Sequence, residues 1–180
     1  MNPKNSVFIA TSLDGYIAGK NDSLAFLDTI PEINKIDTGY EAFTANIDAL
    51  VMGRVTFEIV KGFGTEWPYK KPVFVLSNTM KEVPTEYKDK VFPISGSLTE
   101  VLKQIHEQGY HRLYIDGGKT IQSFLKEDLI DEMIITTIPI LIGGGTPLFS
   151  DLTEQLEFEC TKSIVFLDKI AQNHYRRVRK

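Results

Sequence analysis

The sequence is poor in residues that bind metals or form disulfide bonds. Its single cysteine, Cys160, can form no internal disulfide, and a reducing compartment is the natural setting for such a chain. The three histidines, His106, His111 and His174, are scattered at spacings that do not suit a metal centre. The lone cysteine also excludes the P-C-x-x-C pattern of a zinc deaminase. No metal site is therefore predicted.

Long apolar runs and an excess of positive charge are also missing. The most apolar late stretch (MIITTIPILIGGG) is too short, and too rich in threonine and glycine, to span a bilayer. Residues 1–6 lack the basic and long apolar regions of a signal peptide. The net charge of −4 disfavours a general nucleic-acid binder, which is usually basic. We therefore expect a soluble, cytoplasmic protein that binds neither membranes nor nucleic acids. The basic residues at the C-terminal end, Arg176, Arg177, Arg179 and Lys180, are expected to form a solvated tail, with phosphate binding as the less favoured alternative.

Apolar segments of two kinds follow one another along the chain. Hydrophobic residues make up 42% of the sequence, which is enough for the core of one domain over residues 1–180. Strands are expected over residues 7–13, 48–53, 71–77, 112–116, 132–141, 156–167 and 170–178. Helices are expected around residues 40–47, from Arg54, from about Leu98 with Ser97 or Thr99 as its cap, and around residues 119–125. Strands and helices alternate first, and strands alone follow. This order predicts an α/β fold with a mostly parallel sheet and an antiparallel C-terminal hairpin at its edge.

Three predicted strands end in residues that can bind phosphate. The first junction (MGRVTFE) has Gly53 at the strand end and Arg54 at the start of a helix, where free N–H groups and a guanidinium can meet an anion. Helix capping by Arg54 and Thr56 is an equal alternative. The second junction (VLSNT) offers hydroxyl and amide donors, or forms an ordinary turn. The third (YIDGGKTIQSFL) has Gly117 and Gly118, which permit close approach of a ligand or form a tight turn. Together the three junctions predict one groove at the carboxyl ends of neighbouring strands.

The order and spacing of these motifs resemble a known family. SLDGYIAG, DALVMGRVTFE, PVFVLSNT and DGGKTIQSFLKEDLIDEMIITTIPILIGGGTPLF are similar to the dihydrofolate-reductase-like superfamily, in particular to stand-alone relatives of the riboflavin-biosynthesis reductase domain. The resemblance implies a three-layer dihydrofolate-reductase-like fold, NADPH as the cofactor, a small-molecule substrate and a homodimer.

The same resemblance implies roles for individual residues. Backbone groups of Ala10 and Ile17 would meet the nicotinamide carboxamide, and Ser77 and Asn78 would lie by the 2′-phosphate of adenosine. An unusual cis peptide would join Gly117 and Gly118. The full predicted cofactor set is Ala10, Ile17, Gly53, Arg54, Val55, Thr56, Ser77, Asn78, Thr79, Gly117, Gly118, Lys119 and Thr120.

Three residues are candidates for the chemical step. Asp37 falls where dihydrofolate reductase has its substrate-binding acid, although its position before Thr38-Gly39 suits an N-cap equally well. Asp14 is expected beside the nicotinamide, or simply in an Asp-Gly turn. Thr136 falls where the folate enzyme has a substrate-contacting threonine, or it is an ordinary strand residue.

The activity expected from the resemblance is NADPH-dependent hydride transfer to a pyrimidine or pteridine-like substrate, as in 5-amino-6-(5-phosphoribosylamino)uracil reductase. Genuine dihydrofolate reduction is an alternative, weakened because Phe26 stands where the folate enzymes usually have tryptophan. A second alternative is an NADPH-binding protein without catalysis.

Overall fold

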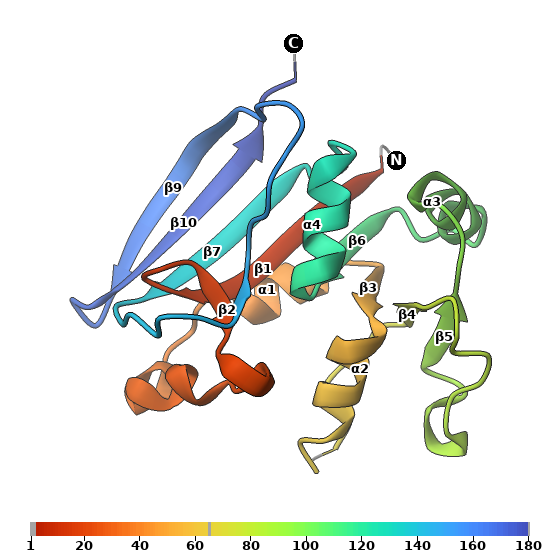
Figure 1. Ribbon diagram of the computed structural model, residues 1–180, viewed down its shortest axis with the longest axis horizontal. Coiled ribbons are helices and arrows are strands. Elements are labelled where there is room, and N and C mark those ends of the chain that lie inside the picture. Colours follow the sequence, from red (N-terminus) through yellow and green to blue (C-terminus); the bar gives the residue numbers. More distant parts are fainter. Residues whose placement is uncertain (1–2, 65, 180) are drawn as a thin grey trace.

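A twisted central sheet runs through the computed structural model, which describes residues 3–64 and 66–179 (Figure 1). In the described part of the chain, eight strands form this sheet in the order β5–β4–β3–β6–β1–β7–β10–β9. They are β1 (Lys4–Ser12), β3 (Ala49–Gly53), β4 (Val73–Leu76), β5 (Val91–Ile94), β6 (Arg112–Asp116), β7 (Glu132–Ile138), β9 (Phe158–Phe166) and β10 (Ile170–Arg177). The strands from β5 to β7 are parallel, and β10 and β9 are antiparallel. The predicted sheet and its antiparallel edge hairpin are confirmed.

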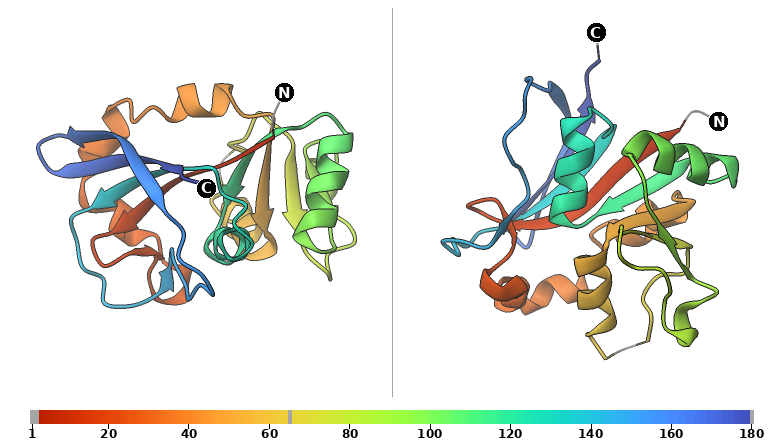
Figure 2. Two further views of the ribbon diagram at one scale, coloured as in Figure 1. Left: turned by 90° about the horizontal axis from the view of Figure 1, so that it is seen from above. Right: turned by 45° about the vertical axis from the view of Figure 1, so that its right-hand side comes forward.

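Helices cover both faces of this sheet, as expected for three layers. They are α1 (Tyr40–Ala45), α2 (Arg54–Lys61), α3 (Leu98–Glu107) and α4 (Gly118–Lys126). Side chains of α3 and α4 pack with Val51 and Ile115 on one face, whereas Phe43 of α1 and Phe57 of α2 pack with Met52 on the other. The left view of Figure 2 shows α1 and α4 on opposite sides of the sheet. The alternation of Val51 and Met52 between the two cores follows from the two-residue period of a strand.

Shorter elements complete the carboxyl side of the sheet. Strands β2 (Tyr16–Ala18) and β8 (Thr146–Pro147) pair with each other. Short 3-10 helices lie at Lys20–Asp22, Ala25–Thr29, Pro31–Lys35 and Thr85–Tyr87. The first three of these lie between β2 and α1, and Figure 1 shows them beyond the carboxyl end of β1. Across the described residues, no helix combines the length and apolarity needed to cross a membrane.

Two details of the strands differ from the sequence expectations. Strand β5 was not predicted, because Pro93 interrupts a segment of only four residues. An edge strand tolerates proline, since its outer side has no neighbouring strand to receive the missing N–H. Strand β7 ends at Ile138 and does not continue to residue 141, because Pro139 has no N–H for the ladder.

The expected solvated tail is wrong for Arg177 and Arg179, whereas Arg176 is exposed within strand β10. The side chain of Arg177 is only 10% exposed and its Nε donates to the carboxylate of Asp128 over 2.6 Å. Arg179 pairs with Asp131, and Arg176 pairs with Glu159 on the neighbouring strand. The ion pairs of Arg177 and Arg179 fasten the C-terminal end to the link between α4 and β7, and that of Arg176 joins β10 to β9. Lys180 lies outside the described residues.

Candidate active site

A cavity of about 860 Å³ opens at the carboxyl ends of the parallel strands. Ligand pockets in proteins commonly have volumes of about 300–1,000 Å³, so this one can hold a cofactor or a substrate. Every residue predicted to bind the cofactor lines the cavity except Thr79. Thr79 lies next to it, because its hydroxyl accepts a hydrogen bond from Nη1 of Arg54 over 3.1 Å. The three predicted junctions therefore do converge on one groove.

The N-termini of α2 and α4 are open toward this cavity. Their N-cap residues are Gly53 and Gly117, no side chain caps either helix, and neither has an acid in its first turn. In contrast, α3 is closed by its own capping box, in which Ser97 and Glu100 bond each other's backbone N–H groups. Uncapped helix N-termini present free N–H groups and a positive dipole end, which favour an anion. Arg54 and Lys119 add positive charge to the same two turns.

Glycine at these junctions lets the two helix starts approach each other. A Cβ on Gly117 would overlap with Oγ1 of Thr56, and one on Gly53 would lie 3.0 Å from Oγ1 of Thr120. Gly117 has a φ of +88°, which favours glycine. The predicted cis peptide between Gly117 and Gly118 is wrong, because that bond is trans. The positive φ of Gly117 achieves the turn from strand to helix with a trans bond.

A carboxylate that the sequence argument did not select lies in this cavity. Asp116 is the last residue of β6 and lines the cavity together with Tyr69 and Tyr114. Burial raises the pKa of Asp116 to about 6, although the N–H of Gly117, 2.8 Å away, and the Tyr69 hydroxyl both oppose the shift. A carboxyl group with this pKa is part protonated near neutrality, so it can hold a proton and release it. In the sequence, Asp116 stands between a buried strand and a pair of glycines, and this position is the signal that could have identified it.

Aromatic side chains surround Asp116 on its face of the sheet. Tyr114 lies two residues before Asp116, and its hydroxyl donates to the backbone oxygen of Phe8 over 2.8 Å. The ring of Phe43 meets both Phe8 and Tyr114 at centroid distances of 5.1 Å. Burial, reinforced by the charge of Asp116, raises the pKa of Tyr69 well above its usual value. The tyrosines therefore stay protonated, and the acid has a largely apolar setting.

The three residues proposed for the chemical step lie elsewhere. Asp37 is exposed and accepts a hydrogen bond from the N–H of Gly39 over 2.7 Å, a turn just before α1. Asp14 accepts from the Ser12 hydroxyl and from the N–H of Gly143, so it ties together two loops. Thr136 is buried against Nε2 of Gln172. None of these three lines the cavity.

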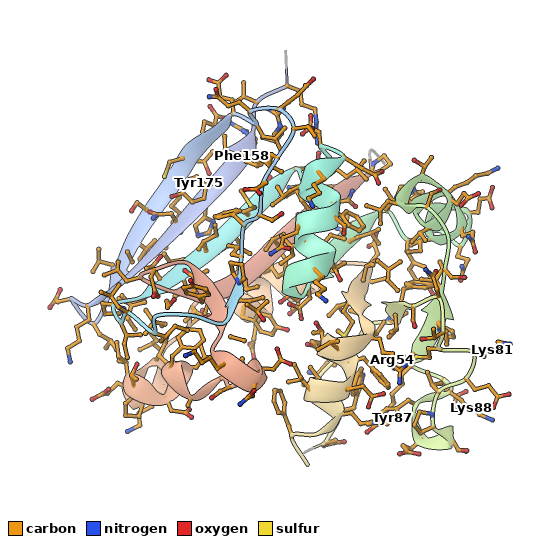
Figure 3. All side chains as sticks on the ribbon, viewed as in Figure 1. Arg54, Lys81, Tyr87, Lys88, Phe158 and Tyr175 are labelled. Atoms are coloured by element: carbon orange, nitrogen blue, oxygen red, sulfur yellow. The ribbon has the colours of Figure 1, made fainter. Side chains whose placement is uncertain are left out.

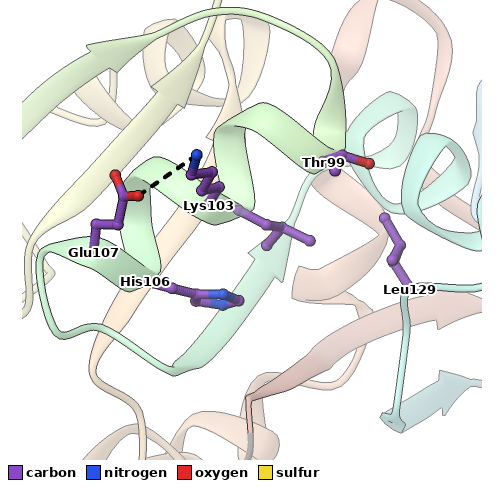
Figure 4. Close-up of a pocket in the computed structure, with 6 residues that line it drawn as sticks. Thr99, Lys103, His106, Glu107 and Leu129 are labelled. Atoms are coloured by element: carbon purple, nitrogen blue, oxygen red, sulfur yellow. Dashed lines mark ion pairs between the residues drawn. The ribbon is translucent and has the colours of Figure 1, made fainter.

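A second hollow, of about 510 Å³, lies beside α3 (Figure 4). Leu102, His106 and Leu129 form its wall, and the ion pair of Lys103 and Glu107 stands at its rim over 3.8 Å. Both charged side chains of that pair are well exposed, so the pair is weak. This hollow contains none of the residues predicted to bind a cofactor.

Comparison with known proteins decides the family. The family model of the RibD C-terminal domain matches residues 3–171. The chain belongs to the RibD C-terminal domain family. Uncharacterized protein YwjB of Bacillus subtilis (strain 168) is 34% identical over 178 residues, covering 98% of this chain and 99% of YwjB. The family is that of a reductase domain, which supports an oxidoreductase.

Several solved structures share the architecture of this chain. A structure described as a "Putative riboflavin biosynthesis protein" from Shewanella sp. PV-4 is 55% identical, with a TM-score of 0.94, and the match covers 98% of this chain and 99% of that one. The deaminase and 5-amino-6-(5-phosphoribosylamino)uracil reductase of Thermotoga maritima shares 16% identity at a TM-score of 0.74, over 98% of this chain and 57% of its own. Dihydrofolate reductase of Enterococcus faecalis, complexed with NADP(H), shares 17% identity at a TM-score of 0.65. The match covers 97% of this chain and 96% of that one. The last two likenesses confirm the dihydrofolate-reductase-like fold of this RibD-family chain.

Proposed function

We propose that this RibD-family protein is an NADPH-dependent reductase of the riboflavin-biosynthesis type, which transfers hydride to a pyrimidine or pteridine-like substrate. The observation that carries the proposal is a single cavity that two uncapped helix N-termini and the carboxyl group of Asp116, whose pKa burial raises, all line. The first feature suits a dinucleotide, and the second suits a reduction that consumes a proton.

The residues present fit the phosphates of such a dinucleotide. The glycines at positions 53 and 117 let the starts of α2 and α4 lie close together, so the free backbone N–H groups of both helices can bind one anionic group. Thr56 and Thr120 place hydroxyl groups in the same first turns, and Lys119 adds a charge. Bound NADPH would supply the hydride. The chain would orient both reactants and limit access of water.

Asp116 is the group we assign to the proton. Reduction of a C=N bond adds a hydride to carbon and a proton to nitrogen, so an acid must lie near the substrate nitrogen. With a pKa of about 6, the carboxyl group of Asp116 can donate that proton and recover it from solvent. The Gly117 N–H and the Tyr69 hydroxyl hold the carboxylate in place.

Arg54 is the residue we assign to the choice of NADPH over NADH. Its side chain extends from the start of α2 to Thr79, at the turn after β4, and Ser77 and Asn78 line the cavity there. Figure 3 shows Arg54 on the side of α2 nearer to β4 and β5, with Lys81 and Lys88 farther out on that side. A guanidinium in this position suits the 2′-phosphate of NADPH.

The test is a calorimetric titration with NADPH and with NADH. Arg54→Ala should weaken NADPH binding by about 10-fold to 100-fold, because a hydrogen bond between charged groups contributes roughly 1.5–3 kcal/mol. Binding of NADH should change much less. Arg176→Ala, which removes an exposed arginine on β10, is the matched control and should leave both affinities unchanged. Equal weakening of NADPH and NADH by Arg54→Ala would contradict the assignment to the 2′-phosphate.

A further inference from the structure

We propose that the substrate end of the cavity accepts an unphosphorylated planar heterocycle, neutral or cationic, and rejects its phosphate ester. The proposal rests on the function proposed above and names the substrate class for that site. It departs from a phosphoribosylamino substrate, which is the one in the description of the Thermotoga maritima enzyme. At 16% identity that likeness concerns the fold alone.

The cationic side chains of the cavity belong to its dinucleotide part. Among the described residues that line it, the lysines and arginines are Lys119 and Arg54. Both lie in the first turn of a helix with an open N-terminus. Arg54 extends away to Thr79, and Lys119 belongs to α4, which packs on the opposite face of the sheet from Tyr114. Under the function proposed above, both charges serve the phosphates of the cofactor.

Away from these two helix starts, much of the cavity lining is apolar. From α2 and the turn after it come Ile59, Val60 and Phe63, and from the segment before α1 come Leu24 and Leu27. The ring of Phe8 completes this part of the wall. The acidic residues that line the cavity are Asp22 and Asp116. Asp22 accepts a hydrogen bond from Thr146, which lies against Gly118 at the start of α4, so Asp116 is the carboxylate of the substrate end. Lys61, at the end of α2, is engaged by Glu58 and lies over the ring of Phe57.

A phosphate group would be disfavoured in such a place. Moving a dianion from water to an apolar wall is costly unless cations or hydrogen-bond donors replace its hydration. Here the ionisable group assigned to the substrate end is the carboxylate of Asp116, which repels it. A flat heterocycle without phosphate gains from stacking on aromatic rings, and its ring N–H or amino groups can donate to Asp116. Phe63 is 52% exposed at the cavity and offers such a surface.

Equilibrium binding of a matched pair of compounds tests the proposal. The pair is 5-amino-6-ribitylaminouracil and its 5′-phosphate, neither of which can accept hydride, so calorimetry in the presence of NADPH reports binding alone. We expect the unphosphorylated compound to bind at least about tenfold more tightly. Equal or tighter binding of the phosphate ester would overturn the proposal. So would failure of both compounds and of lumazine, a simpler planar heterocycle, to bind.

A charge added at the cavity mouth should reverse the preference. Phe63→Lys places a cation on an exposed position and should strengthen binding of the phosphate ester by about tenfold. The control is Phe92→Lys, on the edge strand β5, where a phenylalanine is 38% exposed outside the cavity lining. It should leave both affinities unchanged. If Phe63→Lys gives the ester no gain, the substrate end does not lie at this mouth and the proposal fails.

The two proposals fail in different ways. Binding of NADPH is followed separately through the fluorescence of Trp67, whose ring lies 5.3 Å from that of the cavity residue Tyr69. If the wild-type protein does not bind NADPH, the proposed function is contradicted. Normal NADPH binding with a preference for the ester would contradict the substrate class alone.

Discussion

Asp116 shows how one residue can carry function at the expense of stability. Its carboxyl group is ionised only with difficulty because burial raises its pKa from 3.8 to about 6. An acid whose pKa is higher in the folded state than in the unfolded state destabilises the fold once the pH exceeds the unfolded value. The penalty is absent below about pH 4, grows between pH 4 and 6, and is constant above pH 6. Such a cost at a cavity is typical of a functional group.

Replacing this carboxylate should therefore stabilise the protein at neutral pH. Asp116→Asn keeps an acceptor for the Gly117 N–H and removes the charge, so the free energy of unfolding should rise by roughly 2–3 kcal/mol at pH 8 and not at pH 3.5. Urea denaturation at several pH values measures the difference. The control is Asp14→Asn. Its free energy of unfolding should be lower than that of wild type at pH 8 and closer to it at low pH, because the hydroxyl of Ser12 lowers the pKa of Asp14. If the difference in free energy of unfolding between Asp116→Asn and wild type does not change with pH, the raised pKa of Asp116 is contradicted.

Individual site residues were predictable when their local sequence alone explained them. Glycine after a buried strand, followed by Arg54 or Lys119, already indicates a phosphate-binding turn. Asp116 stands in the same segment, yet its pKa depends on Tyr69 and on burial by distant parts of the chain. Asp37 and Asp14 were chosen from local patterns that turned out to describe turns.

The helices differ in what occupies their N-termini. In α3, Ser97 and Glu100 satisfy the free N–H groups, whereas α2 and α4 begin with glycine and leave theirs open to the cavity. A negative charge in the first turn stabilises a helix by about 0.3–1 kcal/mol. The absence of such a charge in α2 and α4 therefore costs some stability and leaves the site free for an anionic ligand.

Adding that charge should separate stability from binding. Val55→Asp places an acid at the second residue of α2, where the valine is 56% exposed. The variant should be as stable as wild type or more stable by up to about 1 kcal/mol, and it should bind NADPH at least about tenfold more weakly. The control is Thr99→Asp, at the same position of α3. It should be as stable as Val55→Asp and should bind NADPH with unchanged affinity. Unaltered NADPH binding by Val55→Asp, measured by calorimetry, would show that the cofactor does not meet α2.

Most elements could be predicted because each has a clear local signal. Buried apolar runs gave the parallel strands other than β5, and Ser97 was one of the two residues expected to cap α3. Strand β5 and the pairing of β2 with β8 could not be predicted. The first is short and contains Pro93, and the second depends on contacts between Tyr16 and Pro147, which are far apart in the chain.

The whole molecule brings the site together through its strand order. Strand β6 lies between β3 and β1, although it follows both in the sequence, and this places Gly117 beside Thr56 and Ala10 in one cavity. Sequence order alone does not specify which strands are neighbours, so the convergence was an expectation until the sheet was known. At the far edge of the sheet, Val165 on β9 is 62% exposed. The homodimer implied by the family resemblance stays a prediction, and this edge is a surface that it could cover.

The most direct test of the central claim is a crystal structure of the protein with NADPH. The account predicts that the pyrophosphate lies between the N-termini of α2 and α4, with the 2′-phosphate at Arg54 and the nicotinamide toward Asp116. A dinucleotide bound elsewhere, such as in the hollow beside α3, or one whose phosphates do not contact Gly53 to Thr56 and Gly117 to Thr120, would contradict it.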